Sequence, residues 1–282
     1  MRSLPLSCSA FDSGRTAEAH LVADLAGGRT TLRRQHVGYP FHVTRGFHLD
    51  SARPDLLTLY LQSASGGFYA GDRLRLDVTV AANAAFHLTT QAATVVHHGR
   101  DAGSSQQQCV TVGAGAFCAV TSDPYVLFPG ADLGLDTIAT VAAGAVLLLA
   151  DGFAVHDPKQ SRRPFGSFCG RLRVMRPDGR VLLFDRGSIR GDDLHNGALG
   201  AMAAAATAVL IAPREKWPDV EMLREAADRC GCLCGASAAP NEAGMVMRML
   251  APDGGALARG LEAAFHVAGR AALGFELARR RK

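Results

Sequence analysis

The segment from Ser65 to Asp72 contains the residues with the clearest chemical potential in this sequence. It reads Ser-Gly-Gly-Phe-Tyr-Ala-Gly-Asp, so Gly66, Gly67 and Gly71 stand close to one carboxylate. Glycines at this density indicate backbone conformations that other residues avoid, or the close approach of another chain or a ligand. An alternating apolar run begins directly after Asp72 and predicts a half-buried strand. We therefore expect the carboxylate at the mouth of a strand, beside bare backbone.

A second polar segment, Leu88 to Thr94, follows one predicted strand later and reads Leu-Thr-Thr-Gln-Ala-Ala-Thr. Its polar members are Thr89, Thr90, Gln91 and Thr94. They stand where an apolar strand face would be expected, so we expect function in these two segments and a scaffold role for most of the rest. Asp72 also has a purely structural interpretation, in which it is a buried turn carboxylate that accepts hydrogen bonds from the glycine amides.

Motifs of other chemistries are missing or weak. The sequence contains no GxxxxGK[ST] phosphate loop, no GxSxG nucleophile turn and no HExxH metal motif. Cys230, Cys232 and Cys234 alternate, and on a strand their thiols would share one face. Structural zinc sites need four ligands, with at least two residues between paired cysteines. We therefore predict that these thiols pack as small apolar groups and that the chain is not a metalloenzyme.

Three similar strand–turn–strand segments predict the fold. Their turns are rich in small residues and centre on Asn83, Gly115 and Gly144, which recur at about thirty residues. Asn and Gly tolerate positive φ best. Such repeats predict a mainly β, β-helical or layered-sheet solenoid, although ordinary hairpins in a sandwich would give a similar pattern. Two amphipathic helices are predicted, one after Asp219 and one over residues 257–273, within a single domain of residues 1–282.

A β-helical fold leaves one enzymatic alternative, a carbohydrate-active hydrolase or lyase. Such enzymes need two acidic residues on neighbouring strands. Asp72 and Asp151 are the most plausible pair, although nothing in the sequence places them together. A single tryptophan and 6% aromatic residues are poor material for a carbohydrate cleft.

Composition and charge argue against nucleic-acid and membrane partners. The 282 residues are 48% hydrophobic and 20% charged, with a net charge of +4 carried almost wholly by arginine. The only basic run, Arg279 to Lys282, is expected to be a solvated tail. No apolar run reaches the ~20 residues that span a bilayer. Seven cysteines without framework spacing fit a reducing compartment, so we predict a soluble, cytoplasmic protein.

With these residues in hand, the chain resembles the urease accessory protein family UreD, called UreH in some organisms. The resemblance rests on the glycine-rich segment ending in Asp72 and on Leu88 to Thr94, which together are specific. Pro124 to Ala131 is similar to the family's proline-aromatic segment, and Gly231 to Ser237 to its late Gly-x-x-x-Gly-Ala-Ser strand. The similarity extends from about His20 to the last predicted helix.

The resemblance implies a β-helical scaffold that is not itself an enzyme and holds no tightly bound cofactor. It implies binding to a UreF-type accessory protein, recruitment of a UreG-type GTPase through that partner, and docking on the urease apoprotein. It also implies help in delivering nickel to the urease active site. An ion in transit needs weak, oxygen-rich binding sites. Asp72 and Asp151 would suit this role as metal ligands, together with the polar side chains of Thr89, Thr90 and Gln91.

The sequence departs from the family pattern in places. The family's Gly-Glu-x-Phe motif has no glutamate here, where residues 163–168 read Arg-Pro-Phe-Gly-Ser-Phe. Val95 stands where a lysine is common, and His97 where a tyrosine is. These differences predict a divergent branch of the family.

Overall fold

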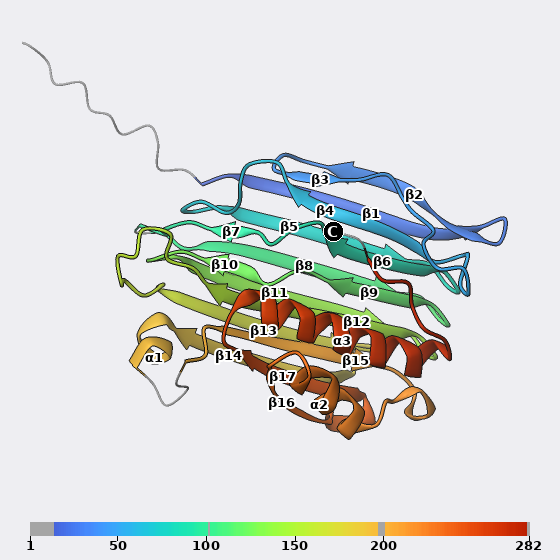
Figure 1. The fold of residues 1–282 in the computed structure, drawn as a ribbon. Coiled ribbons are helices and arrows are strands. Elements are labelled where there is room, and N and C mark those ends of the chain that lie inside the picture. The colour runs from blue at the N-terminus through green and yellow to red at the C-terminus, as the bar shows by residue number, and fades with distance from the viewer. Residues whose placement is uncertain (1–13, 101, 197–200, 281–282) are drawn as a thin grey trace, which may run out of the picture.

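The computed structural model describes residues 14–100, 102–196 and 201–280. Two β-sheets lie face to face, and helices cover the outer face of one of them, so the molecule has three layers (Figure 1). The first 13 residues of the predicted single domain lie outside the described residues, as do the last two residues of the basic C-terminal run.

The first sheet has seven strands in the order β14-β13-β11-β8-β5-β1-β2. Its strands are β1 (Thr16–Ala26), β2 (Arg29–Val37), β5 (Arg73–Val80), β8 (Ser104–Val112), β11 (Asp132–Val141), β13 (Ser167–Met175) and β14 (Val181–Arg190). The inner neighbours pair in parallel, and each edge is closed by an antiparallel hairpin. The hairpin β1–β2 turns at Gly27-Gly28.

The second sheet contains the main path β16-β17-β15-β12-β9-β6-β4-β3, with two short strands, β7 and β10, beside it. Its strands are β3 (Phe41–Val43), β4 (Leu57–Ser63), β6 (Ala85–Thr90), β7 (Val95–Val96), β9 (Phe117–Thr121), β10 (Tyr125–Leu127), β12 (Val146–Val155), β15 (Ala204–Ile211), β16 (Leu233–Ala238) and β17 (Gly244–Ala251). β4, β6, β9 and β12 pair in parallel.

The chain winds between the two sheets in successive stacked coils, which confirms the predicted β-solenoid. β5 leads to β6, β8 to β9 and β11 to β12, each through one of the three predicted turns. Asn83, Gly115 and Gly144 have φ of 62°, 66° and 68°. The turns stack on one another, because the Asn83 amide donates to the Ala114 carbonyl at 2.9 Å. Repeated turn geometry thus fixes the coil spacing.

Replacing Asn83 by alanine is expected to lower the free energy of unfolding by about 1 kcal/mol, because alanine does not adopt positive φ readily. Asn83→Gly should change it by less than about half that amount, since glycine accepts the conformation. Urea denaturation of both variants measures the difference. Equal losses in the two variants would contradict the conformational explanation.

Two apolar cores hold the layers together. The first lies inside the solenoid, between inward-facing residues such as Leu76 and Val78 of β5 and Phe86 of β6. The second lies between the second sheet and the helices, where Leu257 and Phe265 pack over β12, β15 and β17. β12 therefore buries both of its faces, in keeping with its nearly continuous apolar sequence.

Both predicted helices are present. Asp219 caps α2 (Val220–Asp228) by accepting the Glu221 amide at 2.8 Å, as expected. Asp253 caps α3 (Gly254–Leu273) in the same way. The remaining helical pieces are α1 (Gly191–Asn196) and the short 3-10 turns η1 (Arg214–Lys216) and η2 (Pro240–Glu242). Met222 of α2 is half exposed.

The sequence predicts a solvated C-terminal tail, but the segment is packed against the protein up to Arg280. The Arg280 guanidinium lies 4.1 Å from the centre of the Phe265 ring and contacts the His87 ring at 2.9 Å. Burial lowers the pKa of Arg280. The segment therefore ties α3 to β6. Among the described residues, no helix is long and apolar enough to cross a membrane.

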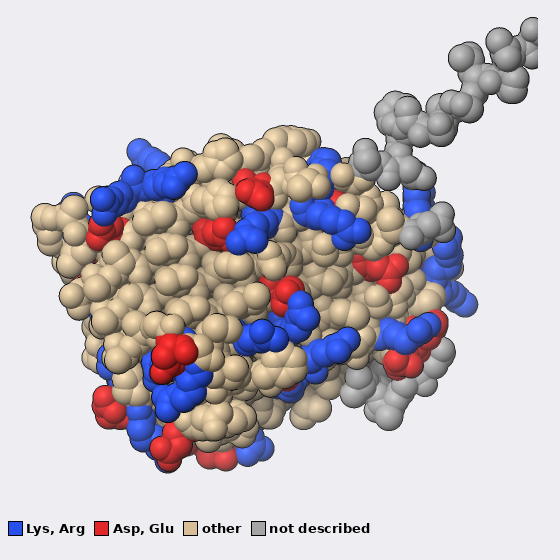
Figure 2. All heavy atoms as spheres, turned by 180° about the vertical axis from the view of Figure 1, so that it is seen from behind, with Lys and Arg blue, Asp and Glu red and all other residues tan. Residues whose placement is uncertain are grey.

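In the part of the chain that the structure describes, no helix covers the outer face of the first sheet. Seen from behind, basic and acidic side chains are interspersed across it (Figure 2). Neighbouring strands form ion pairs there, such as Arg171 with Asp136 at 2.5 Å. Within β5, Arg75 pairs with Asp77 at 3.0 Å.

Candidate functional site

The glycine-rich segment needs its glycines for two reasons, the positive φ of its backbone and the close approach of other parts of the chain. Gly66, Gly67 and Gly71 have φ of 77°, 126° and 77°. A Cβ atom on Gly67 would overlap the Val95 carbonyl, and Gly71 packs backbone to backbone against Gly14. The segment therefore lets two other stretches of chain cross it closely, one from β7 and one from the start of β1.

Asp72 lies at the start of β5, as expected, with a relative exposure of 1%. Its Oδ1 accepts the Arg15 backbone amide and the Arg15 Nε, both at 3.0 Å. Its Oδ2 accepts the Tyr69 amide at 2.8 Å and pairs with Arg15 Nη2. The same Nη2 donates to the Gly67 carbonyl at 3.0 Å. The structural interpretation of Asp72 is thus correct in kind, but the amides come from Tyr69 and Arg15 and not from glycines.

The ion pair determines the charge of Asp72. Burial disfavours its charged form, but the hydrogen bonds from Arg15 and Tyr69 outweigh burial and lower the pKa of the carboxyl. The same hydrogen bond raises the pKa of Arg15. Most of the acceptor capacity of Asp72 is therefore occupied within the protein. Sequence reasoning missed Arg15, because no local pattern connects two residues 57 positions apart.

The second polar segment divides where β6 ends. Thr89 and Thr90 are buried on β6, where the Thr89 hydroxyl donates to the Thr121 carbonyl and the Thr90 hydroxyl accepts the Asp123 amide, each at 2.8 Å. Gln91 is exposed beyond the strand, and Gln62 donates to its side-chain oxygen. Thr90 and Thr94 line a small internal cavity.

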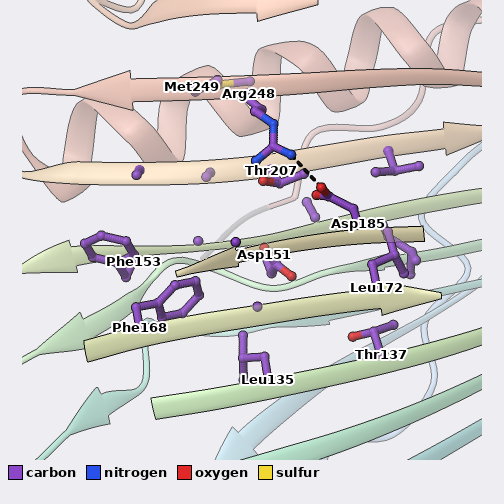
Figure 3. A pocket seen from close by; sticks show the side chains of 18 of the residues that line it. Leu135, Thr137, Asp151, Phe153, Phe168, Leu172, Asp185, Thr207, Arg248 and Met249 are labelled. Carbon is purple, nitrogen blue, oxygen red and sulfur yellow. Dashed lines mark hydrogen bonds and ion pairs between the residues drawn. The ribbon is translucent and has the colours of Figure 1, made fainter. Parts of the chain in front are cut away.

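Asp151 lies in a larger cavity of about 510 Å³ between the two sheets (Figure 3). On β12 it lies on the same face of the strand as Leu147, Leu149 and Phe153, which point into the interior of the solenoid. The polar residues that line this cavity with it include Gln106, Gln108, Ser122, Tyr125, Thr137, Asp185, Thr207 and Arg248. Near Asp151, Arg248 of β17 forms an ion pair with Asp185 of β14 at 2.6 Å, joining the two sheets.

The environment of Asp151 favours its neutral form. Burial, and to a smaller extent the charge of Asp185, raise the pKa of Asp151 to about 6, and Arg248 offsets part of this shift. No protein group that the structure describes donates a hydrogen bond to the Asp151 carboxyl. A buried carboxyl with a pKa this close to neutral can exchange a proton as the pH changes, and its ionised form can bind a cation.

The two polar regions adjoin one another. Gln106, Ser122 and Tyr125 line both the small cavity of Thr90 and Thr94 and the larger cavity of Asp151. Asp72, in contrast, lines a third cavity, on the surface. Because Asp72 and Asp151 line different cavities, they do not flank a common site as the acidic pair of a carbohydrate-active enzyme would.

The alternating cysteines pack as predicted. Cys232 and Cys234 are buried between β16 and the helices, and the Cys232 thiol lies 3.3 Å from the Ala256 carbonyl. Burial raises the pKa of the Cys234 thiol to about 11, so it remains protonated. Within the described residues, no three His, Cys, Asp or Glu side chains gather in a group that could hold a metal ion.

The structure is thus a β-solenoid with helices over one face and a polar cavity between its two sheets. Residues 15–282 match the family described as UreD urease accessory protein, and the chain belongs to this family. The predicted family and the role of accessory protein are thus confirmed.

Relatives support this assignment over the full length. The chain is 67% identical to urease accessory protein UreD 3 of Bradyrhizobium sp. strain ORS 278, and the match covers 100% of both chains. The identity to UreD 1 of Bradyrhizobium sp. strain BTAi1 is also 67%, again over the whole of both chains. UreD 1 of Methylorubrum populi is 43% identical, with 95% of this chain and 92% of the relative covered. The expectation of a divergent branch is wrong, because full-length relatives are this similar.

Proposed function

We propose that this chain is a scaffold for urease maturation in the cytoplasm, and that nickel ions are its cargo. It binds a UreF-type accessory protein, recruits a UreG-type GTPase through that partner, and docks on the urease apoprotein. Membership of the UreD urease accessory protein family supports the role in maturation. The internal cavities support passage of the ion through the body of the protein.

The cavity around Asp151 is the observation that carries the nickel proposal. Beside hydroxyl and amide groups, its lining contains the Asp185–Arg248 ion pair and the Asp151 carboxyl, which forms no ion pair of its own with a described side chain. Nickel binds imidazole and thiolate ligands more strongly than such oxygen ligands. A site of this kind therefore holds the ion weakly and releases it, which transit requires.

The polar segment that ends β6 extends the proposed route. Thr90 and Thr94 line the small cavity, which is separated from the cavity of Asp151 by the shared residues Gln106, Ser122 and Tyr125. In this proposal the ion moves between oxygen ligands of the two cavities. Asp72 would contribute only if the ion displaced Arg15, since the guanidinium occupies both carboxylate oxygens.

Coexpression with the urease structural and accessory genes tests the proposal. The wild-type chain should copurify with the UreF-type protein and with urease subunits. Asp151→Asn should preserve that complex but lower urease activation by about tenfold at limiting nickel, the usual effect of weakening a metal site. Asp228→Asn, an exposed carboxylate of α2, is the matched control and should activate urease normally.

Two results would contradict the proposal separately. Failure of the wild-type chain to associate with any urease component would remove the scaffold role. Full activation by Asp151→Asn at limiting nickel would remove the nickel route through this cavity and leave the scaffold role intact.

A further inference from the structure

A row of aromatic side chains runs across the coils on the surface beside β7 and β10. Phe68, Val96, Leu127 and Val155 occupy equivalent positions, because Phe68 bridges to Val96, and β10 pairs with both β7 and β12. The residue after each of them is aromatic. This aromatic ladder consists of Tyr69, His97, Phe128 and His156.

The ladder rings contact one another along the solenoid axis. Tyr69 stacks on His97 with ring centres 4.4 Å apart. His97 meets Phe128 edge to face at 5.5 Å, and Phe128 lies 5.7 Å from His156. The Arg15 guanidinium extends the row, since it lies 5.0 Å from the Tyr69 ring and 5.8 Å from the Tyr39 ring. Tyr69, at 45% relative exposure, presents its ring to solvent.

Basic side chains border this ladder. Together with Tyr69, His97 and Phe128 they line a surface cleft of about 980 Å³. Arg100, Lys159 and Arg163 are exposed and, within the described residues, form no ion pair. The cleft contains two carboxylates, but Asp72 is neutralised by Arg15 and Asp157 accepts hydrogen bonds from its own loop. The cleft is therefore positively charged.

Size and chemistry indicate what the cleft accommodates. Coils about 4.8 Å apart give a four-residue ladder a length of about 15 Å, or four to five extended residues. Aromatic faces bind other rings and prolines, and unpaired guanidinium and ammonium groups bind carboxylates. The cleft is much longer than a single small anion, so its charge complements a chain of acidic residues.

We propose that the aromatic ladder and its basic border form a docking site for an acidic segment of a partner protein, one that carries an aromatic residue among its Asp and Glu residues. The aromatic residue stacks on the ladder, and its acidic neighbours pair with Arg100, Lys159 and Arg163. The proposal does not depend on the nickel route, because the cleft is separate from the cavity of Asp151.

Fluorescence anisotropy with the full-length chain tests the proposal. The probe is a short fluorescein-labelled peptide of Asp and Glu with a central Trp, compared with its Asn and Gln counterpart. The acidic peptide should bind at least about tenfold more tightly at low salt, as expected for a few exposed ion pairs. The difference should shrink as salt is added.

Variants locate the binding. Lys159→Glu with Arg163→Glu, in an exposed loop, should weaken binding of the acidic peptide by about tenfold or more. Tyr69→Ala should weaken it several-fold by removing the exposed end of the ladder. Arg29→Glu with Arg180→Glu makes the same change in net charge at the opposite end of the first sheet and should leave affinity within about twofold.

Three outcomes would overturn the proposal. Equal binding of the acidic and amide peptides would remove charge recognition. An equal loss in the control pair would show attraction by net charge alone. Complete competition by millimolar inorganic phosphate would show that the cleft is a small-anion site and not a peptide site.

Discussion

Asp151→Asn is expected to stabilise the folded protein by about 2 kcal/mol at pH 7.5. The carboxyl has a pKa of about 6 in the folded state, well above its ordinary value near 4. Its ionised form is therefore disfavoured inside the protein, and asparagine removes that cost while keeping the shape of the side chain. A shift of this size corresponds to a rise in the melting temperature of roughly 4–6 °C.

The stabilisation by Asp151→Asn should depend on pH in a defined direction. Above about pH 6 the carboxyl is ionised in both folded and unfolded chains, so the variant gains its full advantage. As pH falls through 6 the folded wild-type protein binds a proton, and the advantage declines. Below about pH 4 both states are protonated and the advantage is lost.

Thermal unfolding at pH 7.5, 5 and 4 measures this dependence. Asp228→Asn should show little effect at any of these pH values, since that side chain is exposed on α2. Equal melting temperatures of wild type and Asp151→Asn at pH 7.5 would mean that the carboxyl is not destabilised in the cavity. Combined with the expected loss of urease activation, a gain in stability would show that this carboxyl is retained for function.

Asp72→Asn is expected to cost about 3 kcal/mol, because it leaves the Arg15 guanidinium without its counter-charge beside the Gly67 carbonyl. The lowered pKa of Asp72 gives the loss its pH dependence. The ion pair stabilises the wild-type protein at neutral pH. This contribution declines as pH falls below the ordinary carboxyl pKa of the unfolded chain, and it is lost once pH passes below the lowered pKa of Asp72 in the folded protein. Urea unfolding at neutral pH and at pH 3 measures the difference.

Arg15→Gln separates a structural role of Asp72 from a role in nickel transit. It removes the same ion pair but leaves the Asp72 carboxylate free to bind a cation. If Asp72 acts only through the fold, both variants should lower urease activation in proportion to their loss of stability. Markedly greater loss of activation in Asp72→Asn than in Arg15→Gln, at equal stability, would place Asp72 on the nickel route.

Features that depend on local conformation could be predicted from the sequence. Asn83, Gly115 and Gly144 have positive φ at their turns. Few residue types tolerate this conformation, so their recurrence in the sequence marked the turns and indicated stacked coils. The caps of α2 and the hairpin β1–β2 were predictable for the same reason, since each depends on residues close together in the chain.

Features that depend on distant contacts could not be predicted. Arg15 meets Asp72 only because two glycines let the chain before β1 cross the glycine-rich segment. Arg280 reaches Phe265 and His87 only because the chain after α3 turns back over the second sheet. The cavity of Asp151 needs the register of several strands from both sheets, which no local pattern specifies.

The two-residue alternation along the coils restricts where this chain can change in length. On β12, Asp151 shares its side with Leu149 and Phe153, whereas Leu148 and Ala154 face the helices. Inserting one residue before Asp151 within the strand would exchange the two sides, turning the carboxyl toward α3 and a helix-facing residue into the cavity. Length variation is therefore compatible with this architecture in the connecting loops, such as residues 158–164, while the strands themselves must keep their count.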